Sequence, residues 1–109
     1  MTTQDWELNN KLIRKFFLGF INIHILYHAQ REPIYGKEFR KELERHGYSI
    51  SYGTLYPILH SLEREGYLKR EEKNVKGKIR KYYTITDKGG QVFNLLLKQV
   101  KELVNEVFN

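Results

Sequence analysis

The chain has 109 residues, no cysteine, and 19 lysines and arginines against 13 acidic residues, which gives a formal net charge of +6 at pH 7. This length supports one hydrophobic core, so we expect a single compact unit, and the lack of cysteine excludes a disulfide scaffold and a thiolate zinc site. The apolar run at residues 16–27 is shorter than the roughly 20 residues of a membrane helix, and the N-terminus lacks the basic region of a signal peptide, which predicts a cytoplasmic protein.

The first predicted element is a helix from about Asp5 to Ala29. Its apolar side chains are too numerous for one face, which predicts burial on nearly all sides. They are Trp6, Leu12, Ile13, Phe16, Phe17, Phe20, Ile21, Ile23, Leu26 and Tyr27. Trp6, Phe16 and Phe20 are candidates for a subunit interface. Two interpretations of Trp6 stay open: it anchors the helix in that interface, or it lines an aromatic cleft that binds a ligand between subunits.

The segment from Tyr35 to Gly47 is predicted to form a short helix, with Phe39 and Leu43 facing the core and Gly47 ending it. It would be the first helix of a helix-turn-helix. Residues 48–50 would form the turn, and Ile50 would fix that turn to the core.

A second helix of this motif is predicted from Ser51 to Gly66. Ser51 is a favourable N-cap, and Gly66 is well placed to end the helix. An apolar stripe at i, i+3, i+4 and i+7 faces the core and comprises Leu55, Ile58, Leu59 and Leu62. The opposite arc has short, hydrogen-bonding or basic side chains suited to base edges and phosphates: Gly53, Tyr56, Pro57, His60, Ser61 and Arg64.

Pro57 is the anomaly of this helix, because an interior proline removes a backbone donor and costs about 3 kcal/mol. Either the helix begins nearer Tyr56 than Ser51, or it is kinked at the surface that meets a ligand. An ordinary amphipathic helix with a proline in its first turn is the simpler alternative.

From Lys69 to Lys81, seven cations stand against Glu71 and Glu72, a local excess of five. The cations are Lys69, Arg70, Lys73, Lys76, Lys78, Arg80 and Lys81. The flanking strand-forming residues are Tyr67, Leu68, Tyr82, Tyr83 and Ile85. A cationic ribbon with Gly77 at its turn, following a helix, predicts a winged helix that grips DNA. The alternative is a solvent-exposed hairpin without a partner.

The last predicted element is a helix from Asp87 to Phe108. Its seam has the 3, 4, 3, 4 spacing of a coiled coil and comprises Phe93, Leu96, Val100, Leu103 and Val107. A second apolar stripe comprises Val92, Leu97, Val104 and Phe108. Because one small core cannot absorb both stripes, we expect a subunit interface. The alternative is a terminal helix that lies across its own domain.

Three segments, YGKEF (35–39), ISYGTLYPILHSLEREGYL (50–68) and GKIRKYYTITDKG (77–89), resemble the PadR family of transcriptional regulators. The resemblance implies a homodimeric repressor that binds a pseudo-palindromic operator, and in some members an aromatic effector releases the DNA. The predicted fold is mainly α with a small β-hairpin wing: a winged helix-turn-helix with long N-terminal and C-terminal helices. Residues 1–85 would form the DNA-binding part and residues 86–109 the dimerisation helix of one compact unit.

The resemblance assigns DNA contacts to the second helix of the motif and to the wing. Arg64 is added as a candidate because it lies on the polar face predicted for that helix. The candidate DNA-binding residues are Tyr35, Lys37, Ser51, Tyr52, Gly53, Thr54, Tyr56, Pro57, His60, Arg64, Lys76, Lys78, Arg80 and Lys81. The chain departs from the family pattern at Ser61, where a basic residue is frequent, and at Ile79, where the wing often has proline. The operator therefore cannot be inferred from relatives.

Neither an active site nor a cofactor is indicated. His24 and His28 are one helical turn apart, yet no carboxylate or cysteine stands at the spacing of a metal site. His46 and His60 look isolated. The main alternative to a DNA-binding regulator is a winged-helix adaptor that binds an acidic protein without DNA sequence specificity.

Overall fold

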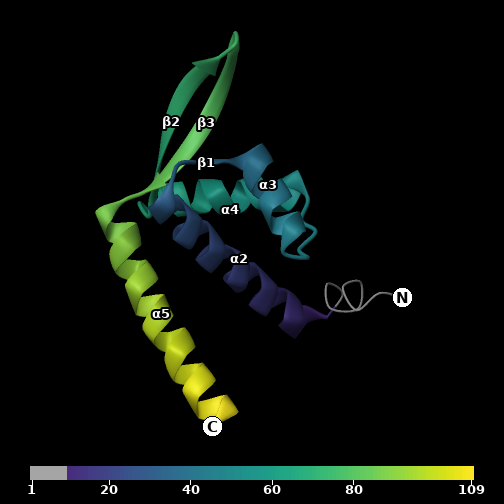
Figure 1. Ribbon diagram of the computed structural model, residues 1–109, viewed down its shortest axis with the longest axis vertical. Helices are drawn as coiled ribbons and strands as arrows, with labels where there is room; N and C mark the ends of the chain where they lie inside the picture. Colours follow the sequence, from purple (N-terminus) through teal and green to yellow (C-terminus); the bar gives the residue numbers. More distant parts are fainter. Residues whose placement is uncertain (1–9) are drawn as a thin grey trace.

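A computed structural model describes residues 10–109, which form four helices and a three-stranded antiparallel sheet (Figure 1). The elements in chain order are α2 (Lys11–Arg31), β1 (Ile34–Tyr35), α3 (Gly36–Arg45), α4 (Tyr52–Arg64), β2 (Leu68–Val75), β3 (Lys78–Ile85) and α5 (Asp87–Phe108). The β2–β3 hairpin, called the wing below, projects from one end of the molecule, and α5 runs to the other end (Figure 1). This arrangement confirms the predicted winged helix-turn-helix with long terminal helices.

Local capping explains where the two helices of the motif begin and end. Gly47 and Gly66 follow α3 and α4 with φ of +88° and +85°, and in both cases two backbone hydrogen bonds close the helix end in a Schellman motif. The Ser51 hydroxyl caps α4 by accepting a hydrogen bond from the Thr54 amide at 3.2 Å. The predicted caps at these three positions are confirmed.

Pro57 lies inside α4, in its second turn, so two of the alternatives, a start nearer Tyr56 and a proline in the first turn, are wrong. The proline has no amide to donate to the carbonyl of Gly53, four residues earlier. Both residues are exposed, and water can therefore satisfy that carbonyl. The capped start at Ser51 stabilises the turn that precedes the proline.

The sheet has a third strand that the sequence did not reveal. Its order is β1-β3-β2, and Ile34 and Tyr35 pair with Tyr83 and Tyr82. Tyr35 was predicted to start a helix, but it belongs to this strand, and α3 begins one residue later. A two-residue strand is too short for an alternating pattern, so only its distant partner defines it.

The wing has strands of eight residues and a tight turn at its tip. Lys76 and Gly77 form this turn with φ of 52° and 83°, as in a type I′ hairpin, and Val75 pairs with Lys78 across it. The predicted place of Gly77 in the turn is confirmed, and its φ is positive. Most of the cations therefore lie along the strands, where alternation sends neighbouring side chains to opposite faces.

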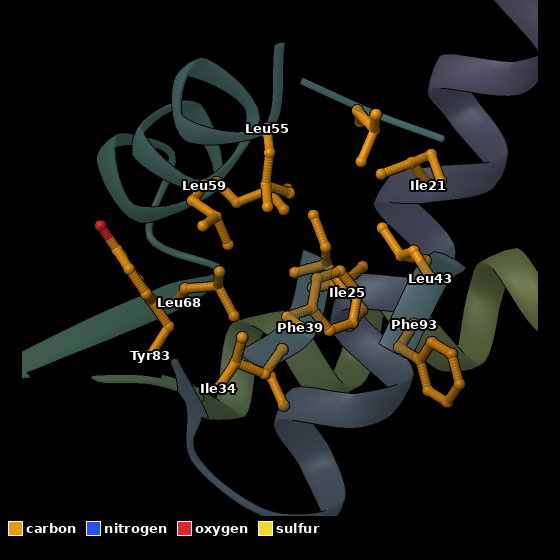
Figure 2. Packing of buried hydrophobic residues seen from close by; sticks show 14 residues of the cluster. Ile21, Ile25, Ile34, Phe39, Leu43, Leu55, Leu59, Leu68, Tyr83 and Phe93 are labelled. Carbon is orange, nitrogen blue, oxygen red and sulfur yellow. The ribbon is translucent and has the colours of Figure 1, made fainter. Parts of the chain in front are cut away.

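The core forms where α2, α3 and α4 meet the base of the wing (Figure 2). Buried side chains include Ile21 and Ile25 of α2, Leu43 of α3, and Leu55 and Leu59 of α4. Members from β1, β3, the turn and α5 complete it: Ile34, Tyr83, Ile50 and Phe93. The inward positions predicted for α3, α4 and the turn are confirmed.

The N-terminal helix differs from its prediction. It begins at Lys11, because the Asn10 side chain caps it by accepting from the amides of Leu12 and Ile13, and it ends at Arg31 rather than Ala29. The expected start at Asp5, and Trp6, lie outside the described residues. Burial on nearly all sides is wrong for the single chain, since Leu12 and Phe16 are 76% and 67% exposed.

Candidate nucleic-acid interface

The exposed face of α4 presents three rings in a row, one helical turn apart, which we call the ring ladder: Tyr52, Tyr56 and His60. Tyr52 and Tyr56 are stacked with centroids 5.5 Å apart, and Tyr56 and His60 are stacked at 6.3 Å. Each ring combines a flat apolar face with a polar group that can donate a hydrogen bond. The ladder therefore offers both stacking and hydrogen bonding to a ligand.

The Tyr56 ring packs closely against Gly36, the first residue of α3. A Cβ on this glycine would lie 3.0 Å from Cε1 and 3.2 Å from the hydroxyl of Tyr56, so only a glycine lets the ring sit this close. Burial, followed by the nearby Tyr52 and Tyr35, raises the pKa of Tyr56. Its hydroxyl therefore stays protonated and able to donate at neutral pH.

Arg40 braces the start of α4 and was not identified from the sequence. Its guanidinium lies 4.7 Å from the ring centre of Tyr52, and its Nε donates to the Ile50 carbonyl at 2.7 Å. Glu44 lies 3.6 Å from the same group. These contacts tie α3 to the turn and to the ring ladder, which fixes how α4 is presented.

The N-terminus of α4 exposes backbone amides and small side chains. Ser51 and Gly53 are exposed, and the Ser51 hydroxyl also donates to Thr54 at 3.2 Å. The Ser51 hydroxyl is therefore engaged in capping, and the Thr54 hydroxyl accepts a hydrogen bond from it. The helix terminus beside them is a favourable position for an anion such as a DNA phosphate.

The alternation of β3 divides the wing residues between two faces. Ile79 and Lys81 face α4, because both line a hollow together with Tyr56 and His60. Lys78 alternates with Ile79 and so belongs to the opposite face. The predicted wing cations therefore do not form one patch.

Arg80 belongs to the face of the wing that looks away from α4. Its guanidinium lies 4.7 Å from the ring centre of Tyr35, the β1 residue that pairs with Tyr82, and 3.8 Å from a Glu38 oxygen. Arg80 is therefore partly engaged within the protein, whereas Lys76, Lys78 and Lys81 are exposed.

The hollow between α4 and the wing has a volume of about 430 Å³ and is called the helix–wing groove below. It is lined by Tyr35, Gly36, Tyr56, His60, Ile79 and Lys81. The other candidate DNA contacts do not line this groove and lie elsewhere on α3, on α4 with its N-cap, and on the wing: Lys37, Ser51, Tyr52, Gly53, Thr54, Pro57, Arg64, Lys76, Lys78 and Arg80. Sequence reasoning did not identify Gly36 or assign a contact to Ile79, because the groove exists only when three separate segments meet.

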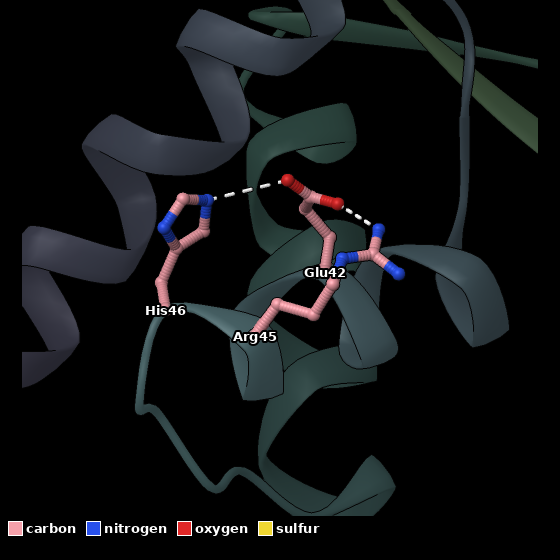
Figure 3. Close-up of polar contacts among 3 residues, drawn as sticks. All are labelled: Glu42, Arg45 and His46. Atoms are coloured by element: carbon pink, nitrogen blue, oxygen red, sulfur yellow. Dashed lines mark hydrogen bonds and ion pairs between the residues drawn. The ribbon is translucent and has the colours of Figure 1, made fainter.

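A histidine cluster lies away from this surface, where α2 meets the end of α3. The His24 ring lies 6.2 Å from both His28 and His46, and Glu42 pairs with His46 and Arg45 (Figure 3). The interpretation of His46 as isolated is therefore wrong. Burial is the main cause that lowers the pKa of His24 and His28. Among the described residues, no group of three potential ligands is arranged to hold a metal ion.

A second, apolar groove of about 690 Å³ lies between α2 and α5 and is called the α2–α5 groove below. Its apolar lining comprises Phe16, Phe20, Ile23, Leu96, Val100, Leu103, Val104, Val107 and Phe108. Of the candidate interface residues, Phe93 instead packs in the chain's own core at 4% exposure. Val100, Leu103 and Val107 are 42%, 56% and 62% exposed, which leaves the end of α5 without cover from its own chain.

Within residues 10–109, every helix is too short or too polar to serve as a membrane-spanning segment.

Residues 25–95 match the model of the transcriptional regulator PadR-like family. A transcriptional regulator of Mycobacterium tuberculosis, Rv3488, is 39% identical over 95 residues, which cover 87% of this chain and 89% of the relative.

Solved structures agree with this match. A PadR family transcriptional regulator from Eggerthella lenta has a TM-score of 0.80 and 32% identity, and the alignment covers 97% of this chain and 94% of that one. A PadR-like transcription factor from Bacteroides fragilis has a TM-score of 0.79 and 28% identity, with 90% and 96% covered. The chain therefore belongs to the PadR-like family of transcriptional regulators, which implies DNA binding rather than enzyme activity.

Proposed function

We propose that this regulator is a homodimeric repressor that binds a pseudo-palindromic operator, with α4 in the major groove and the wing on the adjacent backbone. One observation carries the proposal: Tyr56 and His60 of the ring ladder and Lys81 of the wing line a single groove, so one strand of a duplex can contact both elements. Base edges would be contacted from the start of α4, and phosphates from Lys76, Lys78 and Lys81. The family match supports DNA as the partner.

The dimer interface is proposed to form from α5, residues 86–109 acting as the dimerisation helix, together with the exposed side of α2. Leu103 and Val107 continue the predicted seam beyond the chain's own core, and Phe16 lies across the α2–α5 groove from them. An apolar surface of this extent is seldom left exposed by a soluble monomer. Because Phe93 is already buried, the partner would contact the seam from Leu96 onward.

A small aromatic effector is proposed to occupy the α2–α5 groove at this interface. The groove is of the size usual for small-molecule sites, and its walls are apolar and aromatic, with Lys15 and Asn22 as polar groups. A ligand there would contact both the interface helix and α2, whose far end packs into the DNA-binding core. It could therefore alter the spacing of the two α4 helices.

Selection of bound duplexes from a random pool at near-physiological salt tests the proposal. We expect enrichment of an inverted repeat whose half-sites are centred roughly 34 Å apart on one face of the duplex. If each subunit makes about four cation contacts, log affinity should fall with log salt at a slope of about −7. Equal binding to selected and scrambled duplexes would contradict the proposal and favour a protein-binding adaptor.

A further inference from the structure

We propose that the helix–wing groove holds one deoxyribose and its phosphate, and that Ile79 packs against the sugar and makes the protein reject a ribose at that position. This inference rests on the proposed DNA-binding function. It adds a specificity-determining residue and names the chemical feature that it senses, the 2′ position of one sugar in each half-site.

The polar part of the groove is suited to a phosphate. Lys81 contributes a charged ammonium group and Tyr56 a protonated hydroxyl, and His60 adds a ring nitrogen. All three are exposed side chains on the walls of the same hollow. Phosphate oxygens accept hydrogen bonds from such donors, and the cation adds electrostatic attraction.

The apolar part of the groove is suited to a sugar without a 2′-hydroxyl. Ile79 is 60% exposed, although it stands between Lys78 and Arg80 in a cationic strand. Its side chain has no hydrogen-bonding atom, so it can cover the C2′ methylene of a deoxyribose. A ribose hydroxyl pressed against it would lose water without gaining a partner.

The geometry of the groove is fixed by contacts outside it, which allows this discrimination. The absence of a side chain at Gly36 lets the Tyr56 ring pack directly against α3, and β1 pairs with β3 so that Tyr35 lies opposite Tyr82. Alternation along β3 places Arg80 on the other face of the wing, where its guanidinium contacts the Tyr35 ring. The phosphate contact on the groove side is therefore left to Lys81, two residues from Ile79 along the same face.

The test is a scan of the selected operator with single ribonucleotides, each carried in an otherwise DNA duplex. For the unaltered protein we expect affinity to fall about tenfold at one position per half-site and to change little elsewhere. Ile79→Ser, which supplies a hydroxyl partner, should abolish the loss, and Ile79→Val should retain it. Val75→Ser is the matched control, because Val75 lies near the same turn but on the opposite face.

A 2′-fluoro nucleotide at the sensitive positions separates the hydroxyl from sugar pucker, because fluorine favours the ribose-like pucker without being a donor. The 2′-fluoro duplex should bind nearly as well as DNA. The groove proposal alone would be overturned by any of three results: no ribonucleotide lowers affinity, the loss of affinity persists in Ile79→Ser, or the 2′-fluoro nucleotide lowers affinity as much as the ribonucleotide. Failure of the protein to select any duplex would overturn the proposed function as well.

Discussion

Gly89 is the position where one added methyl group should do most harm. It lies in the first turn of α5, is buried, and donates its amide to the Thr86 hydroxyl at 3.0 Å. A Cβ there would lie 2.1 Å from the backbone oxygen of Tyr67 and 2.8 Å from Ile85 Cγ1. Since the nearest atom belongs to the backbone, the change Gly89→Ala cannot be relieved by a side-chain rotation.

The cost follows from the displacement that alanine requires. Moving from 2.1 Å to a contact of about 3.4 Å means separating α5 from Tyr67 by about 1.3 Å. That shift would strain the hydrogen bond from the Thr86 amide to the Tyr67 oxygen, now 3.1 Å long. Overpacking of this kind costs about 1–3 kcal/mol and a lost hydrogen bond about 1 kcal/mol, offset by about 1 kcal/mol of helix propensity. We expect a net destabilisation of about 1–3 kcal/mol.

Thermal unfolding followed by circular dichroism, at one fixed protein concentration, measures this effect. A loss of about 1–3 kcal/mol should lower Tm by roughly 4–24 °C. The matched control is Gly90→Ala, where a Cβ would meet nothing within 4 Å, and which should stabilise the helix by up to about 1 kcal/mol. If the two variants unfold at the same temperature, the close contact between α5 and Tyr67 does not exist as described.

Three further predictions concern pH, salt and capping. Burial lowers the pKa of His24 and His28 below 6.5, so the native state resists their protonation. The stability that these neutral side chains contribute is therefore complete above pH 6.5 and is lost as the pH falls through the lowered pKa values. The urea midpoint should therefore drop between about pH 7.5 and 5.5, and less so in His24→Gln. Lys78→Ala should make the salt slope of operator binding shallower by about 1, whereas Lys98→Ala on α5 should leave it unchanged. Ser51→Ala should cost about 1 kcal/mol in denaturant unfolding, and an unchanged midpoint would contradict the role of this cap.

The sequence predicted most of the elements because their boundaries depend on short-range contacts. The Ser51 cap acts on an amide three residues away, and Gly47 and Gly66 end helices through hydrogen bonds that span at most five residues. The helix from Asp87 to Phe108 was likewise evident from its apolar spacing. Such signals are contained in one segment, so they do not depend on the path of the chain.

The candidate site was predicted only in part, because it depends on contacts between segments that are distant in the chain. Tyr56, His60 and Lys81 were identified by their helix face and by charge, but their position in one groove depends on Gly36 and β1. The alternation that sends Arg80 away from Lys81 required the register of β3, which follows from the turn at the wing tip.

The sequence by itself determined the helix-turn-helix, the cationic wing and the apolar C-terminal helix, since each is defined by periodicity, capping or charge within one segment. Only the tertiary structure decided the third strand, the tight contact of Gly89, the meeting of His24 with His46, and the exposure of Ile79 inside a groove. Those features join residues that are distant in the chain. Their energies depend on packing geometry, which residue types in a linear order do not specify.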